Sequence, residues 1–321
     1  AKEATCTEHG LTAGTRCSEC NTILKAQEVF SLSVLSELAF MDYLADKFPQ
    51  FQTEKKAISV NDPTSMRIEE IANCFDAKVC RAEVGEANVV NLARNLREQG
   101  YQVRILGEGS NGGTITNPAA VRDPINTIFA LLKLLCIKDE VLPNGKVVLG
   151  LFHRWCKYSG NESLYKEDFS LDDVFATLPK YVTTGVSENR AILHIKTSEH
   201  SELKAKYQKN FENFWQEKKD YLKEKYNISS YQAVCNNGTK QTDNLTDFSV
   251  SAKGGLKVIF YNEEKNPISF IWMRGSGTES AFRVMCDVKV LDNSENSLEN
   301  AISFEKELLE YHSNLIKLSD K

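Results

Sequence analysis

A segment rich in glycine and hydroxyl residues, MRGSGTESAFR, runs from Met273 to Arg283 between two expected strands. Backbone N–H groups and hydroxyls in such a loop can converge on an anion, and the Arg274 guanidinium can add charge-assisted hydrogen bonds. The same composition also suits a plain hairpin loop with a surface arginine. The residues alone therefore predict either a phosphate-binding loop or an ordinary turn.

A second glycine-rich segment, GEGSNGG, extends from Gly107 to Gly113 after the expected strand YQVRIL. It satisfies the G-x-G-x-x-G pattern of dinucleotide-binding proteins, but that pattern must open a helix. Here the polar stretch TITNPAAVRDP follows instead, which argues against a dinucleotide site. The carboxylate of Glu108 and the hydroxyl of Ser110 can instead bind neighbouring hydroxyl groups of a sugar.

Possible metal ligands cluster near the amino terminus, in CTEHG and CSECN. Two residues separate the ligands of each pair, so their side chains can converge on one ion, and the following Gly or Asn tolerates a left-handed turn. Cys6, His9, Cys17 and Cys20 would form a closed structural zinc site with no open position for catalysis. The alternatives to zinc are a disulfide and free thiols.

The elements that position these segments follow from the apolar pattern. From Ala26 a long helix is followed by the strands KKAISV, AKVCRAEV and YQVRILG, with helical segments between them, which indicates parallel βαβ units. Later, LKVIFY, ISFIWMR and FRVMCDVKV alternate as antiparallel strands between two amphipathic helices. The fold class is therefore α/β plus α+β: a mixed βαβ sheet domain, then a smaller antiparallel-sheet domain with packed helices.

This pattern divides the chain into a Cys/His-rich segment (1–26), an α/β domain (27–180) that contains the possible sugar-binding loop, and an α+β domain (181–321) that contains the possible phosphate-binding loop. The stretch AILHIKT is expected to be a strand near the start of the last domain. The helix after it is expected to bury one apolar face, made by Leu203, Tyr207, Phe211, Phe214 and Tyr221.

Bulk properties exclude several classes of protein. The formal charge of −5 comes without a basic stretch, which argues against a nucleic-acid partner. The longest apolar run is too short to cross a bilayer, no signal peptide opens the sequence, and we expect a cytoplasmic location without membrane contact. The six cysteines outside the amino-terminal cluster lie mostly beside apolar neighbours, as reduced core thiols do.

The string RGSGTESAFRV resembles the phosphate-binding loop in the last domain of the α-D-phosphohexomutases, the phosphoglucomutase and phosphomannomutase family. This resemblance implies that Arg274, Ser276, Gly277, Thr278 and Arg283 bind a substrate phosphate. The family usually has proline where this chain has Gly275 and Ser280.

The segment GEGSNGG resembles the family's sugar-binding loop Gly-Glu-x-Ser-Gly-Gly, with Asn111 as an extra residue, which implies that Glu108 and Ser110 bind the sugar. RDPINTIFALLKLL and EVGEANVV resemble two further family segments, so the resemblance covers Ala26 to the carboxyl end.

Two parts of the family pattern do not occur in the sequence: the Thr-x-Ser-His-Asn-Pro loop of the phosphoserine and the Asp-x-Asp-x-Asp loop that binds magnesium. The resemblance therefore implies the carboxy-terminal half of a mutase that interconverts hexose 1-phosphate and 6-phosphate. Magnesium and the chemistry would belong to missing amino-terminal domains, no catalytic residue is assigned here, and this chain alone would be inactive. The alternative is a non-catalytic sugar-phosphate-binding module.

Overall fold

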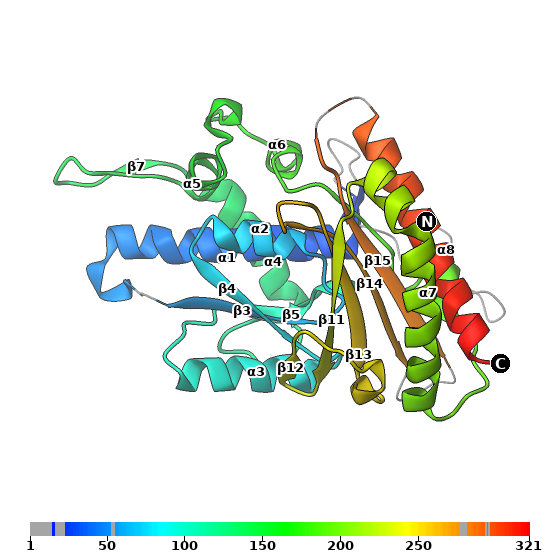
Figure 1. Cartoon of the computed structure of the whole chain (residues 1–321). Helices are drawn as coiled ribbons and strands as arrows, with labels where there is room; N and C mark the ends of the chain where they lie inside the picture. Colours follow the sequence, from blue (N-terminus) through cyan, green and yellow to red (C-terminus); the bar gives the residue numbers. More distant parts are fainter. Residues whose placement is uncertain (1–14, 17–22, 53–54, 276–280, 293, 295) are drawn as a thin grey trace, which may run out of the picture.

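The computed structural model describes residues 15–16, 23–52, 55–275, 281–292, 294 and 296–321. It contains a mixed sheet in the first half and an antiparallel sheet in the second, each with helices packed on it (Figure 1). The fold class predicted from the sequence is therefore confirmed. The boundaries predicted at residues 26 and 180 stay a prediction.

The first sheet has its strands in the order β4-β3-β5-β6. β3 pairs in parallel with β4 and β5, and β6 is antiparallel to β5. The strands are β3 (Lys56–Asn61), β4 (Ala77–Ala82), β5 (Ile105–Glu108) and β6 (Gly113–Thr116). Because β3, β4 and β5 run in the same direction, their carboxyl ends meet at one edge of the sheet.

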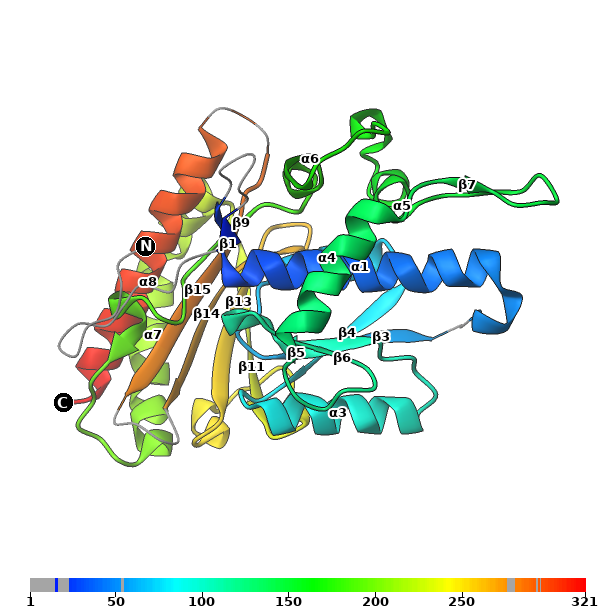
Figure 2. The ribbon, with the colours of Figure 1, turned by 180° about the vertical axis from the view of Figure 1, so that it is seen from behind.

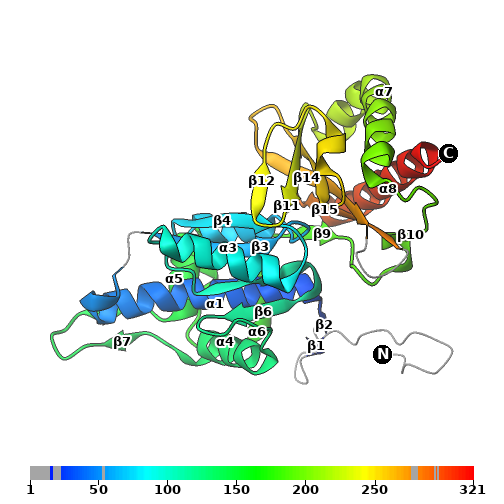
Figure 3. The same cartoon turned by 90° about the horizontal axis from the view of Figure 1, so that it is seen from below.

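Helices cover both faces of this sheet, because both faces of its strands carry apolar residues. Ala57 and Leu106 face α3, whereas Ile58 and Val60 belong to the core formed with α1, α2 and α5 (Figure 3). The helices are α1 (Ala26–Lys47), α2 (Arg67–Asn73), α3 (Glu86–Glu98), α4 (Pro124–Cys136), α5 (Leu151–Tyr158) and α6 (Leu171–Ala176).

Short elements complete this half. Figure 2 shows α4 lying across α1 on the side opposite to α3, with the hairpin of β7 and β8 projecting beyond it. These elements are β1 (Thr15–Arg16), β2 (Ile23–Leu24), β7 (Glu140–Val141), β8 (Val147–Val148) and the 3-10 helices η1 (Pro49–Phe51), η2 (Gly109–Asn111) and η3 (Glu162–Leu164).

The second sheet is antiparallel, in the order β10-β15-β14-β13-β11-β12, with β9 also paired to β15. Its strands are β9 (Tyr181–Thr183), β10 (Ile192–Leu193), β11 (Ser230–Asn237), β12 (Lys240–Thr242), β13 (Gly255–Tyr261), β14 (Pro267–Gly275) and β15 (Phe282–Lys289). Two 3-10 helices, η4 (Asn189–Ala191) and η5 (Phe248–Ser251), join the strands to their neighbours.

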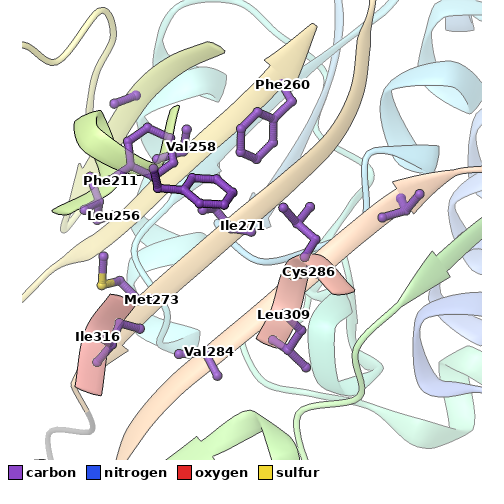
Figure 4. Packing of buried hydrophobic residues seen from close by; sticks show 14 of the residues in the cluster. Phe211, Leu256, Val258, Phe260, Ile271, Met273, Val284, Cys286, Leu309 and Ile316 are labelled. Atoms are coloured by element: carbon purple, nitrogen blue, oxygen red, sulfur yellow. The ribbon is translucent and has the colours of Figure 1, made fainter. Parts of the chain in front are cut away.

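One face of the second sheet is covered by α7 (His200–Tyr226) and α8 (Ser297–Ser319). Every second residue of the central strands points into this core, including Val258, Ile271 and Val284, where they meet Phe211 and Leu309 (Figure 4). Residues of the other parity, such as Trp272, point to the opposite face, towards the first sheet.

Three sequence expectations need correction. AILHIKT forms only the two-residue strand β10, because Ala191 belongs to η4 and Leu193 already pairs with Phe282, the first residue of β15. Tyr221 is 36% exposed and donates its hydroxyl to Glu307, and Leu222 is the buried residue of that helical turn. The described cysteines are free, but Cys136 is exposed rather than part of a core. No helix among the residues described is long and apolar enough to span a bilayer.

Candidate functional site

Acidic residues gather where the parallel strands of the first sheet end. Asp62 follows β3, Glu83 follows β4, and Glu108 ends β5. The carboxyl edge of such a sheet is the usual place for a ligand site. The residues that could bind a ligand are therefore placed by strand direction, and the face of the second sheet lies against this edge.

The two halves of the chain meet at this edge through buried polar contacts. Lys257 Nζ lies 2.7 Å from Asp62 Oδ1, and Trp272 Nε1 donates to Asp62 Oδ2 at 2.8 Å. Burial lowers the pKa of Lys257 to about 8. Nearby, Asp287 is fully buried and accepts hydrogen bonds from the Ser65 hydroxyl and the Met66 backbone. Burial raises the pKa of Asp287. These contacts fix the second sheet against the first.

Glu108, a predicted sugar ligand, is buried with partners from its own half. Its Oε1 accepts the Gly85 backbone N–H at 2.8 Å and a longer contact of 3.4 Å from Asn61. Its Oε2 accepts Arg122 Nη2 at 2.6 Å, and Arg122 also pairs with Glu86. Arg122 is about half exposed, whereas the Glu108 carboxylate that it pairs with is buried.

Ser110, the second predicted sugar ligand, lies two residues after Glu108, in η2. Its hydroxyl accepts Asn61 Nδ2 at 2.8 Å. The loop bends back on itself through Gly107, where a Cβ would lie 2.0 Å from the Gly113 carbonyl oxygen, so only glycine fits. A helix does not open directly from this loop, since only η2 stands between β5 and β6. That agrees with rejecting a dinucleotide site.

Arg274 and Arg283, predicted to bind phosphate, are direct partners across β14 and β15. Cross-strand partners point to the same face, and Trp272, two residues from Arg274, contacts Asp62 on the first sheet. Both arginines therefore face the first half of the chain. Arg274 donates Nε and Nη2 to Glu83 Oε1 at 3.0 and 2.9 Å, and Arg283 donates Nη1 to the Val186 carbonyl at 3.0 Å.

A pocket of about 240 Å³ lies between the two halves. Ser110 and Asn111 line it from the loop Gly107 to Gly113 of the first half, and Trp272 and Arg283 line it from the second. The structure thus brings Ser110 and Arg283 to one cavity. Glu108 and Arg274 do not line it; they lie next to it, each held by a partner of opposite charge.

His200, at the start of α7, lies under the strand ends that carry these arginines. A Cβ on Gly275 would lie 1.9 Å from His200 Cε1, so the imidazole occupies the space that a proline would need at this position. The ring also packs edge-on against Phe282. Burial and the neighbouring Lys204 lower the pKa of His200, and burial lowers the pKa of Lys204 to about 7.

The other predicted site residues lie outside the described part of the chain. These are Ser276, Gly277 and Thr278 of the phosphate loop, and Cys6, His9, Cys17 and Cys20 of the possible zinc site. Their roles stay predictions. Among the residues that the structure does describe, no group of three or more His, Cys, Asp or Glu could hold a metal ion.

Sequence reasoning did not single out Asp62, Glu83, Lys257 and Trp272. Asp62 and Glu83 had a usable signal, because each is an acid directly after an expected parallel strand. Lys257 and Trp272 had none, since their role depends on how the second sheet docks on the first.

Part of the chain is similar to a domain of a known family. Residues 38–146 match the model of the α/β/α domain III of phosphoglucomutases and phosphomannomutases. The resemblance seen in the sequence is therefore confirmed for this segment, which contains the loop from Gly107 to Gly113. No curated protein matches the chain.

Solved structures from the same family also align with the chain. One is the open form of the exocytosis-sensitive phosphoprotein pp63/parafusin, a phosphoglucomutase from Paramecium, with 14% identity, a TM-score of 0.48, and coverage of 91% of this chain and 42% of that protein. Another is a phosphoglucomutase/phosphomannomutase family protein from Burkholderia thailandensis, with 12% identity, a TM-score of 0.41, and coverage of 92% and 43%. The chain thus spans about two fifths of the length of these proteins.

Proposed function

We propose that this chain recognises a hexose phosphate, as the sugar- and phosphate-binding part of an α-D-phosphohexomutase. Such an enzyme is an isomerase of carbohydrate metabolism, an intramolecular phosphotransferase that interconverts hexose 1-phosphate and 6-phosphate. The observation that supports this proposal best is the pocket that Ser110 and Arg283 line from the two halves of the chain. A hydroxyl on one wall and a guanidinium on the other suit a ligand with a sugar at one end and a phosphate at the other.

The size of the pocket favours a small ligand. Ligand sites usually start at about 300 Å³, and this pocket of about 240 Å³ is open to solvent on the side of Asn111 and Ser187. That space suits a single sugar ring with its phosphate better than an oligosaccharide or a dinucleotide. Arg274, beside the pocket, would add a second positive charge for the phosphate.

Titration of the 321-residue chain with glucose 6-phosphate and mannose 6-phosphate tests this proposal. We expect binding of the sugar phosphates that weakens about tenfold or more in Arg283→Ala, because a charge-assisted bond to the phosphate is lost. Arg97→Ala is the matched control, because Arg97, on α3, also donates to a backbone carbonyl, that of Val103, at 2.7 Å. Absence of saturable binding, or an equal effect of the two substitutions, would contradict the proposal.

The part played in catalysis needs a separate assay. The phosphoserine and magnesium loops of the family do not occur in this sequence, so we expect the purified chain to convert no measurable glucose 1-phosphate, with or without magnesium and a bisphosphate activator. The amino-terminal domains of the family would be the partners that supply the chemistry. Turnover by the chain alone would reject this division of roles and also the alternative of a purely binding module.

A further inference from the structure

Glu83 holds Arg274 from the opposite half of the chain. Both Nε and Nη2 of Arg274 donate to one carboxylate oxygen, Glu83 Oε1, at 3.0 and 2.9 Å. The side chains of Arg274 and Glu83 are 21% and 18% exposed, so the ion pair is partly buried. A carboxylate oxygen in this position offers Arg274 the same kind of negatively charged hydrogen-bond acceptor as a phosphate oxygen.

The second oxygen of Glu83 has a different partner. Glu83 Oε2 accepts the backbone N–H of Gly238 at 2.8 Å, and the Glu83 backbone N–H donates to the Gly238 carbonyl at 2.8 Å. Gly238 lies in the turn between β11 and β12. Glu83 therefore joins the first sheet to the second even without Arg274, and Arg274 can leave Glu83 while this backbone pairing remains.

Glu83 is the acid that pairs with Arg274, and a second cation, Lys204, lies nearby. Lys204, fully buried one turn into α7, donates to the carbonyls of Ala252 and Gly254 at 2.8 and 2.7 Å. The charge of Arg274 lowers the pKa of Lys204, whereas Glu83, the ion-pair partner of Arg274, raises it together with Asp62. Without the Glu83 charge, an approaching anion would meet a positive site.

We propose that Glu83 is an internal competitor for the ligand's phosphate, an affinity-determining residue that occupies Arg274 until a phosphate displaces it. This inference rests on the proposed function, because it takes Arg274 as a phosphate ligand. On binding, the phosphate takes over the Nε and Nη2 donors of Arg274, and Glu83 keeps its contacts to Gly238 while its freed oxygen turns to water. The chain thus binds phosphate more weakly than its arginines would allow.

Glu83→Gln tests the competition, because it removes the charge and keeps the size of the side chain. We expect glucose 6-phosphate and inorganic phosphate to bind about fivefold more tightly to Glu83→Gln, the gain for releasing one partly exposed ion pair of about 1 kcal/mol. In an Arg274→Ala background the same substitution should leave both affinities unchanged. Thermal unfolding of each variant shows that the comparison is made between folded proteins.

The possible outcomes separate this inference from the proposed function. Tighter phosphate binding by Glu83→Gln that disappears without Arg274 supports the competition. Equal or weaker binding by Glu83→Gln, while the wild-type chain still binds glucose 6-phosphate in an Arg283-dependent way, overturns the role of Glu83 and leaves the proposed function standing. Tighter binding that persists in the Arg274→Ala background also overturns it, since the effect would not act through Arg274. Absence of binding by both proteins overturns the proposed function and the inference together.

Discussion

The candidate site has two ends, which we name after their proposed ligands: the sugar end at Glu108 and Ser110, and the phosphate end at Arg274 and Arg283. The two ends are stabilised in different ways. Glu108, at the sugar end, is 3% exposed and is held by Asn61, Gly85 and Arg122, all from its own half of the chain. Arg274, at the phosphate end, is held by Glu83 from the other half. The sugar end is therefore complete once the first half folds, whereas the phosphate end takes its present geometry only when the two sheets dock.

This difference assigns different consequences to substitutions at the two ends. A change at the sugar end should alter recognition of the sugar and leave the docking of the halves intact. A change at the phosphate end, or in the contacts beneath it, should affect both docking and anion binding. The predictions below test this contrast, starting with the contact that fixes the docking.

The largest effect is expected at Lys257, whose ammonium lies 2.7 Å from Asp62 in a site that water does not reach. Lys257→Met leaves the Asp62 carboxylate buried with only the Trp272 N–H, so we expect a loss of about 3–5 kcal/mol in the free energy of unfolding. Urea unfolding measures this loss. The double variant Lys257→Met with Asp62→Asn should recover most of it, because no buried charge then lacks a partner.

The matched control for that pair is Lys223, which pairs with Glu263 while both side chains stay more than half exposed. Lys223→Met should destabilise the protein far less than Lys257→Met does, because water screens an exposed pair. Equal losses for Lys257→Met and Lys223→Met would show that the buried pair does not hold the halves together, and the contrast between the two ends would lose its basis.

The next largest effect is expected for Arg274→Ala in binding of a hexose phosphate. Loss of a guanidinium from a partly desolvated anion site should weaken binding by about 2–4 kcal/mol, and Arg274→Lys should restore only part, because an ammonium lacks the bidentate fork. In a complete mutase the loss should raise KM more than it lowers kcat, since the contact exists before and during the reaction. A decrease in kcat at constant KM would contradict this role.

How much of this could be predicted from the sequence differs between the two ends. The segment from Gly107 to Gly113 was predicted as a loop because its glycines, Glu108 and Ser110 are local in the sequence. Its backbone path needs several of these glycines, since Gly107 and Gly112 have positive φ and a Cβ on Gly109 would clash with Phe30. The pairing of Arg274 with Glu83 joins residues 191 positions apart. No periodicity or spacing contains that information, because it depends on the docking of one sheet on the other.

The same physical limit explains the smaller errors. The strand expected in AILHIKT has only two residues, because η4 takes Ala191 and the partner strand β15 begins opposite Leu193. Lys204 lies on the apolar face of α7 between Leu203 and Tyr207, and its burial follows from two carbonyls that a loop elsewhere in the chain presents to it. Tertiary contacts, rather than helix periodicity, make that buried lysine possible.

Lys204 also gives a pH-dependent test of the phosphate end. Burial lowers its pKa in the folded chain from 10.5 to about 7, so between these values the unfolded chain binds more protons than the folded chain. The stability that this group contributes therefore rises with pH through that window and is constant below it. We expect the unfolding free energy of the wild type, relative to Lys204→Met, to increase by up to about 1.4 kcal/mol per pH unit above pH 7. Parallel profiles for the two proteins would show that Lys204 is not buried as a titrating ammonium.

The smallest effect is expected at Ser110, in the end of the site that is complete by itself. Its hydroxyl accepts one hydrogen bond from Asn61 and lines the pocket shared with Arg283. Ser110→Ala removes a neutral hydrogen bond to the sugar, worth about 0.5–1.5 kcal/mol, so affinity for glucose 6-phosphate should fall by roughly twofold to thirteenfold.

Comparing ligands makes the Ser110 test specific, because affinity for inorganic phosphate should stay unchanged in Ser110→Ala and should fall in Arg274→Ala. If the sugar and phosphate ends are separate, the two substitutions must differ in their effect on inorganic phosphate. A Ser110→Ala variant that loses both ligands equally would mean that the hydroxyl shapes the whole pocket through Asn61. In that case the sugar end is not independent of the phosphate end, and the pocket has to be treated as one unit.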